Sequence, residues 1–242
     1  MNKRPKLRLT LITLAALLPM VACAPSTNNR QTKERRSNLA HLIAAGCVFT
    51  FDENENAPRT ATFSDSSATD ELLIRLSALG SLEEVNLDAS PHVSDVGVKV
   101  LARLPRLRVL NMAGTGISDD AIGEMANLRR LYIWRTRVSD VGVRHLQSLT
   151  GLRVLNLCDT KTSDEGIQGL AALTKLKVLC VGNSAPAGDR RLDASPRSSV
   201  TRAGVEDLRE RLPTTQIVFW IEDSHPSSPQ IRLAGNNSPN ND

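Results

Sequence analysis

The sequence predicts an α/β fold: a right-handed solenoid with parallel strands on its concave side and short helices on its convex side. Three observations support this prediction. A unit of about 24 residues recurs along the middle of the 242-residue chain, each unit has a strand-like half and a helix-like half, and aromatic residues make up only 3% of the sequence. Leu, Val and Ile must therefore supply most of the core, which suits the thin, layered core of a repeat protein.

Each unit begins at a leucine. The leading residues are Leu82, Leu107, Leu128, Leu152 and Leu176. The shared frame reads LxxLxLxxT, then a variable turn, then SDxG and an apolar residue at about every third position. The alternating apolar residues of LxL predict a short strand with one buried face. The three-residue spacing of the second half predicts one apolar stripe of a short helix.

A serine stands where each predicted helix begins, and an aspartate follows it. These pairs are Ser94–Asp95, Ser118–Asp119, Ser139–Asp140 and Ser163–Asp164. A serine at the N-cap accepts a hydrogen bond from an otherwise unpaired backbone N–H, and an aspartate suits the positive end of the helix dipole. The aspartates are therefore interpreted as helix-start residues and not as metal ligands.

With these motifs, residues 57–219 resemble the leucine-rich repeat family. The form LxxLxLxxT followed by SDxG is similar to the short repeats of bacterial lipoproteins and other cell-envelope proteins. Many leucine-rich repeats carry an asparagine at the ninth position, whereas this chain carries hydroxyl residues there. They are Ser90, Thr115, Thr136, Thr160 and Ser184. Their hydroxyls are expected to bond the backbone of each turn, forming a Ser/Thr ladder.

Several parts of the predicted repeat domain, residues 39–220, depart from the frame. The unit from Leu107 is three residues short, so its helix must be clipped. The last unit carries an insertion at about 183–199, and a closing strand is expected at 216–220. A hairpin of residues 48–51 and 59–63 is expected to cap the first repeat, because a terminal repeat otherwise exposes its apolar face.

The N-terminus predicts export and lipidation. Residues 1–22 combine four basic residues with an apolar run too short to span a bilayer, which is typical of a signal peptide. Ala22 and Cys23 end this run as in a bacterial lipobox, so lipid on the Cys23 thiol is expected to anchor the protein to the membrane. Ordinary cleavage near Ala22 is the alternative. Residues 23–38 are predicted to be a disordered tether and residues 221–242 a disordered tail.

The expected location is therefore the cell envelope, with lipid anchoring at the outer membrane or periplasmic face. Residues 1–22 hold four of the 30 basic residues and none of the 26 acidic ones, so residues 23–242 have no net charge. The basic pI of the chain thus belongs to the signal peptide, and no nucleic acid partner is expected.

The cysteines and histidines show no metal-ligand spacing, so neither a metal nor another cofactor is expected. Cys158 and Cys180 are predicted on the same face of adjacent strands, with Cα atoms about 8 Å apart. This distance exceeds the disulfide limit of about 7 Å. Both are therefore predicted to be free thiols.

Repeat-equivalent positions supply no nucleophile, base and orienting acid together, so the chain is not expected to be an enzyme. The concave face instead carries Tyr132 and Trp134, where the frame requires no aromatic residue. Aromatic and arginine residues are enriched at binding hot spots. The predicted partner-binding residues are Tyr132, Trp134, Arg130, Arg135, Asn111, Asn156 and Asp88.

These residues favour a non-catalytic scaffold that binds a protein partner at the cell envelope. The alternative is a structural envelope lipoprotein without a dedicated ligand, in which the aromatic pair only shields the stack of strands.

Overall fold

The computed structural model describes residues 29–53, 57–63, 67–123, 125, 127–183 and 197–220. The predicted signal peptide, Cys23, Ser184 and the predicted tail lie outside these residues. Within the described part of the chain, no helix is both long and apolar enough to cross a lipid bilayer.

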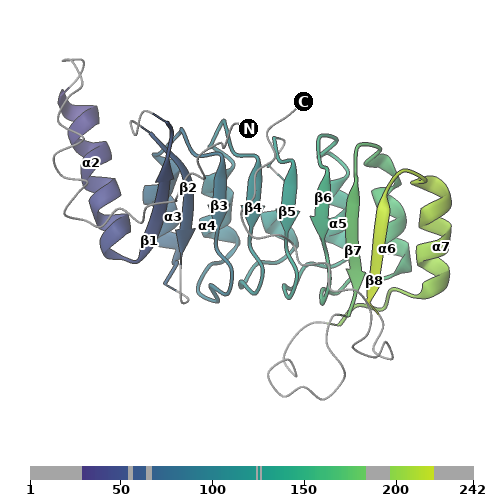
Figure 1. Cartoon of the computed structure of the whole chain (residues 1–242). Helices are drawn as coiled ribbons and strands as arrows, with labels where there is room; N and C mark the ends of the chain where they lie inside the picture. Colours follow the sequence, from purple (N-terminus) through teal and green to yellow (C-terminus); the bar gives the residue numbers. More distant parts are fainter. Residues whose placement is uncertain are drawn as a thin grey trace, which may run out of the picture.

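Eight strands form one sheet, and their order in the sheet follows their order in the sequence (Figure 1). They are β1 (Cys47–Phe51), β2 (Pro58–Phe63), β3 (Glu84–Asn86), β4 (Val109–Asn111), β5 (Arg130–Tyr132), β6 (Val154–Asn156), β7 (Val178–Gly182) and β8 (Gln216–Trp220). The first pair is antiparallel and all later pairs are parallel. The middle residue of each central strand pairs with the next one, so the repeats stack in register.

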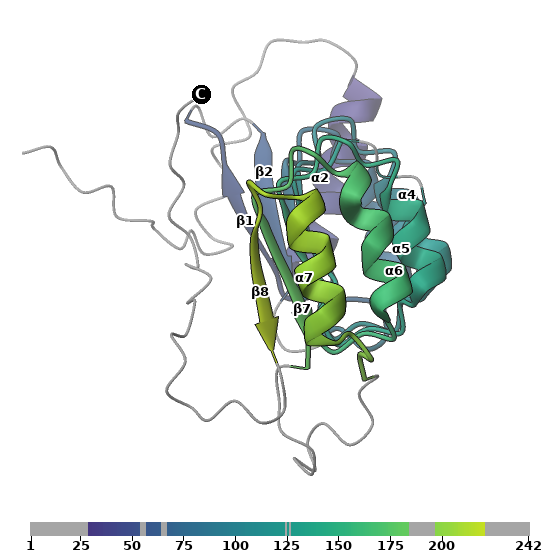
Figure 2. The same ribbon diagram turned by 90° about the vertical axis from the view of Figure 1, so that its right-hand side faces the viewer.

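Helices cover the other side of the molecule (Figure 2). They are α3 (Asp70–Ser77), α4 (Asp95–Leu101), α5 (Asp140–Leu146), α6 (Asp164–Gln168) and α7 (Arg202–Arg211), with the 3₁₀ helices η1 (Asp119–Ala121) and η2 (Gly169–Ala172). One strand and one helical segment alternate around a right-handed path. The predicted leucine-rich repeat solenoid is therefore confirmed.

The core is a single apolar layer between the sheet and the helices. All five leading leucines of the repeat frame lie in it, with at most 3% of their surface exposed. The middle residues of the central strands are equally buried, for example Leu110 and Leu131. Each repeat thus adds one apolar layer that only its neighbours can cover, and the two ends of the stack need caps.

The N-terminal cap consists of the predicted hairpin and an additional helix. Ala61 and Phe63 of β2 are buried and belong to the core that the hairpin covers at this end. The helix α2 (Asn29–Ala44) leads into β1 and occupies part of the segment predicted to be a disordered tether. The helix packs against the core through Leu39 and Leu42, which lie in its last turns beyond the predicted tether.

The helix starts are linked from repeat to repeat by a carboxylate. The first helical residue of one unit accepts two hydrogen bonds from the N-cap residue of the next, one from the backbone N–H and one from the hydroxyl. For example, Asp140 binds the Ser163 N–H at 2.8 Å and its hydroxyl at 2.5 Å. The five links are Asp70–Ser94, Asp95–Ser118, Asp119–Ser139, Asp140–Ser163 and Asp164–Thr201. We call this series the Asp–Ser edge.

These links correct the prediction for the serines. All four stand at the N-cap, as predicted, but only Ser94 and Ser139 accept a bond from their own helix, at 3.2 Å. Ser118 and Ser163 make no such cap bond. All four hydroxyls donate to the aspartate of the preceding unit, and this charged acceptor strengthens the hydrogen bond.

The glycine of the SDxG motif has a related reason. A Cβ added to Gly97, Gly166 or Gly204 would overlap the carboxylate of the preceding repeat's aspartate. At Gly142 that Cβ would lie 2.5 Å from the Asp119 carboxylate. The motif therefore describes a contact between repeats, in which glycine leaves room for the aspartate.

The predicted hydroxyl ladder is confirmed at its three threonines. Thr115, Thr136 and Thr160 are buried, and each hydroxyl donates to the backbone carbonyl three residues earlier at 2.6–2.7 Å. Ser90 differs, because its buried hydroxyl oxygen has no hydrogen-bond partner in the described structure.

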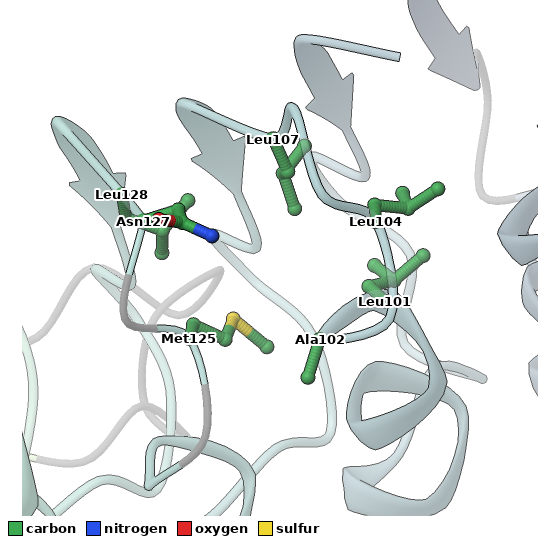
Figure 3. Close-up of a pocket in the computed structure, with 7 residues that line it drawn as sticks. All are labelled: Leu101, Ala102, Leu104, Leu107, Met125, Asn127 and Leu128. Carbon is green, nitrogen blue, oxygen red and sulfur yellow. The ribbon is translucent and has the colours of Figure 1, made fainter. Parts of the chain in front are cut away.

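The clipped unit from Leu107 also follows the prediction. Its helix is reduced to η1, and Leu128 serves both to end this unit and to start the next strand. One apolar helix position is lost with the missing residues. A pocket of about 270 Å³ lies there (Figure 3), lined by Leu101, Ala102, Leu104, Leu107, Met125, Asn127 and Leu128.

The predicted insertion leaves the solenoid stacking unchanged. Asn183 and Ser198 close its base with two hydrogen bonds of 2.9 Å, and residues 184–196 lie outside the described part. After it, α7 and β8 resume the frame, with Thr201 taking the place of the N-cap serine.

Candidate binding surface on the strand side

The outer side of the sheet, opposite the helices, carries the residues predicted to bind a partner. Strand side chains alternate, so the neighbours of each buried middle residue point away from the core. Backbone pairing places Asn86, Asn111, Tyr132, Asn156, Cys180 and Val218 in one row across six strands. We call this side the sheet face.

A second row lies two residues further along each strand. Backbone hydrogen bonds of 2.8–3.0 Å connect successive strands at this level, so the register continues beyond the strand ends. Its last four members are Trp134, Cys158, Gly182 and Trp220, which we call the aromatic row. Trp134 and Trp220 are separated by three strand spacings, about 14 Å. The two smaller residues between them leave both indoles as the largest side chains of the row.

Trp220 was not among the predicted site residues. The insertion before α7 hides the register of β8 in the sequence, although residues 216–220 are recognised as a strand. In the structure Ile217 is buried and Phe219 packs against the core, so Val218 and Trp220 face outward. The alternation within the closing strand could have identified both.

Arg135 is held beside Trp134 by an unusual backbone conformation. Its φ is 57°, in the left-handed region. The equivalent residues of three other repeats share it: Ala89, Gly114 and Asp159 have φ of 56°, 63° and 54°. The turn of the repeat thus demands this conformation, which favours glycine. In the repeat from Leu128 this position holds Arg135, whose guanidinium lies 5.5 Å from the centre of the Trp134 ring, a cation–π contact.

Two arginines of β5 and its turn interact with two acids of β3 across β4. Burial raises the pKa of Glu84, and the positive charge of Arg130 acts in the opposite direction. Burial likewise raises the pKa of Asp88, which the Ala89 N–H and the charge of Arg135 partly offset. Three of the predicted site residues, Arg130, Arg135 and Asp88, therefore take part in two pairs of opposite charge, and the second pair lies beside Trp134.

Tyr132 is half-buried and interacts with the first of these pairs, Glu84 and Arg130. Burial raises the pKa of its phenol, Arg130 acts against this, and Glu84 and Cys180 add to it. The phenol is therefore neutral at physiological pH and can both donate and accept hydrogen bonds.

The predicted residues Asn111 and Asn156 have a structural role. Each side-chain oxygen accepts the backbone N–H two residues later, at 3.1 Å and 3.0 Å, and Asn86 does the same at 3.0 Å. Asn156 is also buried. These asparagines stabilise the turns of their repeats. Tyr132 occupies the equivalent position and has no side-chain amide for this bond.

The thiols on the sheet face are free, as predicted. Cys158 and Cys180 form no disulfide, and both are buried, with 3% and 7% of their surface exposed. Burial raises the pKa of both thiols. Because the thiolate is the reactive form, these cysteines fill space in the sheet face and are poor nucleophiles.

Within the described residues, no group of three or more His, Cys, Asp or Glu side chains is arranged to hold a metal ion.

The chain matches no protein-family model and no curated protein sequence. Among solved structures it is similar to two internalins of Listeria monocytogenes str. 4b F2365. Internalin inlF is 18% identical, with 64% of this chain and 38% of that chain covered and a TM-score of 0.46. Internalin C2 is 22% identical, with 61% of this chain and 55% of that chain covered and a TM-score of 0.43. The chain thus spans less than two thirds of either internalin structure.

Proposed function

We propose that the chain is a non-catalytic scaffold that binds a protein partner on its sheet face, held at the bacterial cell envelope by lipid on Cys23. The binding surface consists of Tyr132, Trp134, Arg130, Arg135 and Asp88. The structure adds Trp220 at the far end of the aromatic row. Asn111 and Asn156 contribute through the turns that they stabilise.

One observation carries this proposal. Three repeats use asparagine to bond their own turn, whereas the repeat from Leu128 places Tyr132 there, next to Trp134 and its cation–π partner. The repeat gains nothing for its turn from this exchange. Large aromatic rings beside arginine are the side chains that contribute most to protein interfaces.

The test is affinity capture of the protein from an envelope extract, followed by mass spectrometry of the recovered proteins. The double variant Tyr132→Asn, Trp134→Ala removes both rings and restores the turn asparagine. It is expected to lose the partner that the unchanged protein recovers.

A matched control removes apolar surface from the helix side. Val96 and Val141 are exposed there, so the double variant Val96→Ala, Val141→Ala is expected to recover the partner fully. Full recovery of the partner by both double variants would contradict the proposed binding surface. Recovery of no specific partner by the unchanged protein would support the alternative, a structural envelope lipoprotein without a dedicated ligand.

Lipid anchoring has a separate test. Cys23→Ser removes the thiol that would carry the acyl group, so the variant is expected to leave the membrane fraction and lose metabolic labelling with a fatty acid. Membrane association with labelling intact would contradict the anchor.

A further inference from the structure

Positive charge gathers along one edge of the solenoid, where the chain passes from each helical segment into the next strand. Three of these connections, residues 102–108, 147–153 and 173–177, contain no acidic residue, and the fourth, residues 122–129, contains one, Glu124, which lies outside the described residues. Seven exposed cations lie in them: Arg103, Arg106, Arg108, Arg129, Arg153, Lys175 and Lys177. We call this surface the basic edge. It opposes the Asp–Ser edge, so the charge of the repeats is divided between the two edges.

The cations lie close together because the strands do. Successive connections are about 4.8 Å apart where they enter the sheet. Arg108 and Arg129 each donate to a backbone carbonyl of the following connection, at 3.2 Å and 3.4 Å, which holds their side chains along the edge. No ion pair within the described structure involves any of the seven. At the N-terminal end of this edge, the three acids Asp52, Glu53 and Glu83 act on Arg59.

The N-terminal helix starts at the same edge. Cys47 pairs with Phe63, the last residue of β2, so β1 begins at the edge where the parallel strands end. The helix α2 stops just before β1 and runs alongside the sheet (Figure 1), which brings its first turn to the edge where the parallel strands begin. Cys23 precedes this helix by six residues, a reach of at most about 21 Å for an extended chain.

We infer that the basic edge binds the anionic phospholipid headgroups of the membrane. This inference rests on the proposed lipid anchor, which would hold the same edge within reach of the bilayer. Each Lys or Arg at an anionic surface contributes a modest attraction, and a lipid chain combined with a basic patch binds more stably than either alone. The sheet face would then be roughly perpendicular to the membrane plane and would remain accessible to a protein partner.

The experiment measures binding to lipid vesicles without the acyl chain. A chain that begins at residue 23 and carries Cys23→Ser retains the whole described core, which extends from Leu39 to Phe219. It is expected to partition onto vesicles containing about one third phosphatidylglycerol, to ignore pure phosphatidylcholine vesicles, and to dissociate as salt rises.

Two charge-reversal variants of this chain separate the edges. Arg106→Glu with Lys175→Glu is expected to lower partitioning about ten-fold. Lys161→Glu with Arg202→Glu makes the same change in net charge at the opposite edge and is expected to lower it less than about two-fold. All four side chains are exposed, so both variants are expected to fold, which circular dichroism would check.

Equal losses in the two variants would overturn the inference, because net charge alone would then explain binding. Binding to soluble polyglutamate together with no binding to anionic vesicles would also overturn it, and would assign the edge to an acidic polymer. Protein capture through Tyr132 and Trp134 is expected to survive Arg106→Glu with Lys175→Glu, so failure here is distinguishable from failure of the proposed function.

Discussion

The Asp–Ser edge and the sheet face follow the same repeat but treat it differently. Along the edge, every unit presents the same carboxylate to the same N-cap hydroxyl and N–H, even across the insertion between Asp164 and Thr201. On the sheet face, equivalent positions hold asparagine, tyrosine and cysteine. The edge joins one repeat to the next, so a change there costs stability. The sheet face does not join the repeats in this way, so its residues can vary. The residues that differ from the repeat pattern there are the candidates for binding.

The largest effect is expected from breaking one link of the edge. Asp119 accepts the Ser139 N–H and hydroxyl, both at 2.6 Å, and the Gly142 N–H at 3.0 Å. Asp119→Ala leaves these partly buried donors without a charged acceptor and is expected to cost about 3 kcal/mol of unfolding free energy. The adjacent Asp120 is exposed, and Asp120→Ala is expected to cost less than about 0.5 kcal/mol. Urea unfolding of both variants measures the difference, and similar midpoints would contradict the structural role of the edge.

The glycine of the edge gives the next largest effect. Gly166→Ala places a methyl group on the Asp140 carboxylate and is expected to cost about 2 kcal/mol, since the link must shift. Gly123 in the clipped unit has no atom within 4 Å of an added Cβ. Gly123→Ala is therefore expected to leave the unfolding midpoint nearly unchanged. A comparable loss from both substitutions would contradict a cost that comes from the contact with Asp140.

The sequence pattern within one repeat predicts the structure of that repeat well. It predicts the contacts between repeats less well. The leading leucines, the clipped unit, the hairpin cap and the turn threonines follow from periodicity and residue type within one unit. The role of Asp140 does not follow from one unit, because its partner Ser163 lies in the next repeat. The helix dipole already explains an aspartate at the start of a helix, so the sequence gives no reason to look for a second role. α2 is missed for a similar reason, since the polar residues 29–38 look like a tether and the helix contacts the core only beyond them, through Leu39 and Leu42.

The candidate surface is predicted only in part, because some of its features also depend on contacts and register beyond a single repeat. Tyr132 and Trp134 stand out within their unit, and backbone pairing places them on the sheet face as expected. Trp220 is missed because the insertion hides the register of β8, although the alternation of Ile217 and Phe219 within that strand points to it. Asn111 and Asn156 look like binding residues until their bonds to the turns are seen. Which protein rests on this face is a matter for capture experiments.

A smaller effect, of opposite sign, is expected at Arg135. Its left-handed backbone disfavours a side chain, so Arg135→Gly is expected to raise the unfolding free energy by about 0.5–1 kcal/mol while removing the cation over Trp134. The control is Arg144→Gly in α5, where glycine is expected to cost about 1 kcal/mol. Thermal unfolding compares the two. A loss at Arg135 as large as that at Arg144 would mean that its contacts hold the fold together.

The smallest effect on stability is expected at Tyr132, where the two readings of the aromatic pair separate. Tyr132→Asn supplies the oxygen that bonds the turn in three other repeats, worth about 1 kcal/mol, and loses the burial of a half-exposed ring. The two terms nearly cancel, so the unfolding midpoint is expected to stay within about 1 kcal/mol of the unchanged protein. If the ring only shielded the strands, the same substitution would destabilise the repeat and leave partner recovery unaltered. If the ring binds the partner, the substitution leaves the unfolding free energy nearly unchanged and lowers recovery of the partner, because the turn does not depend on the tyrosine.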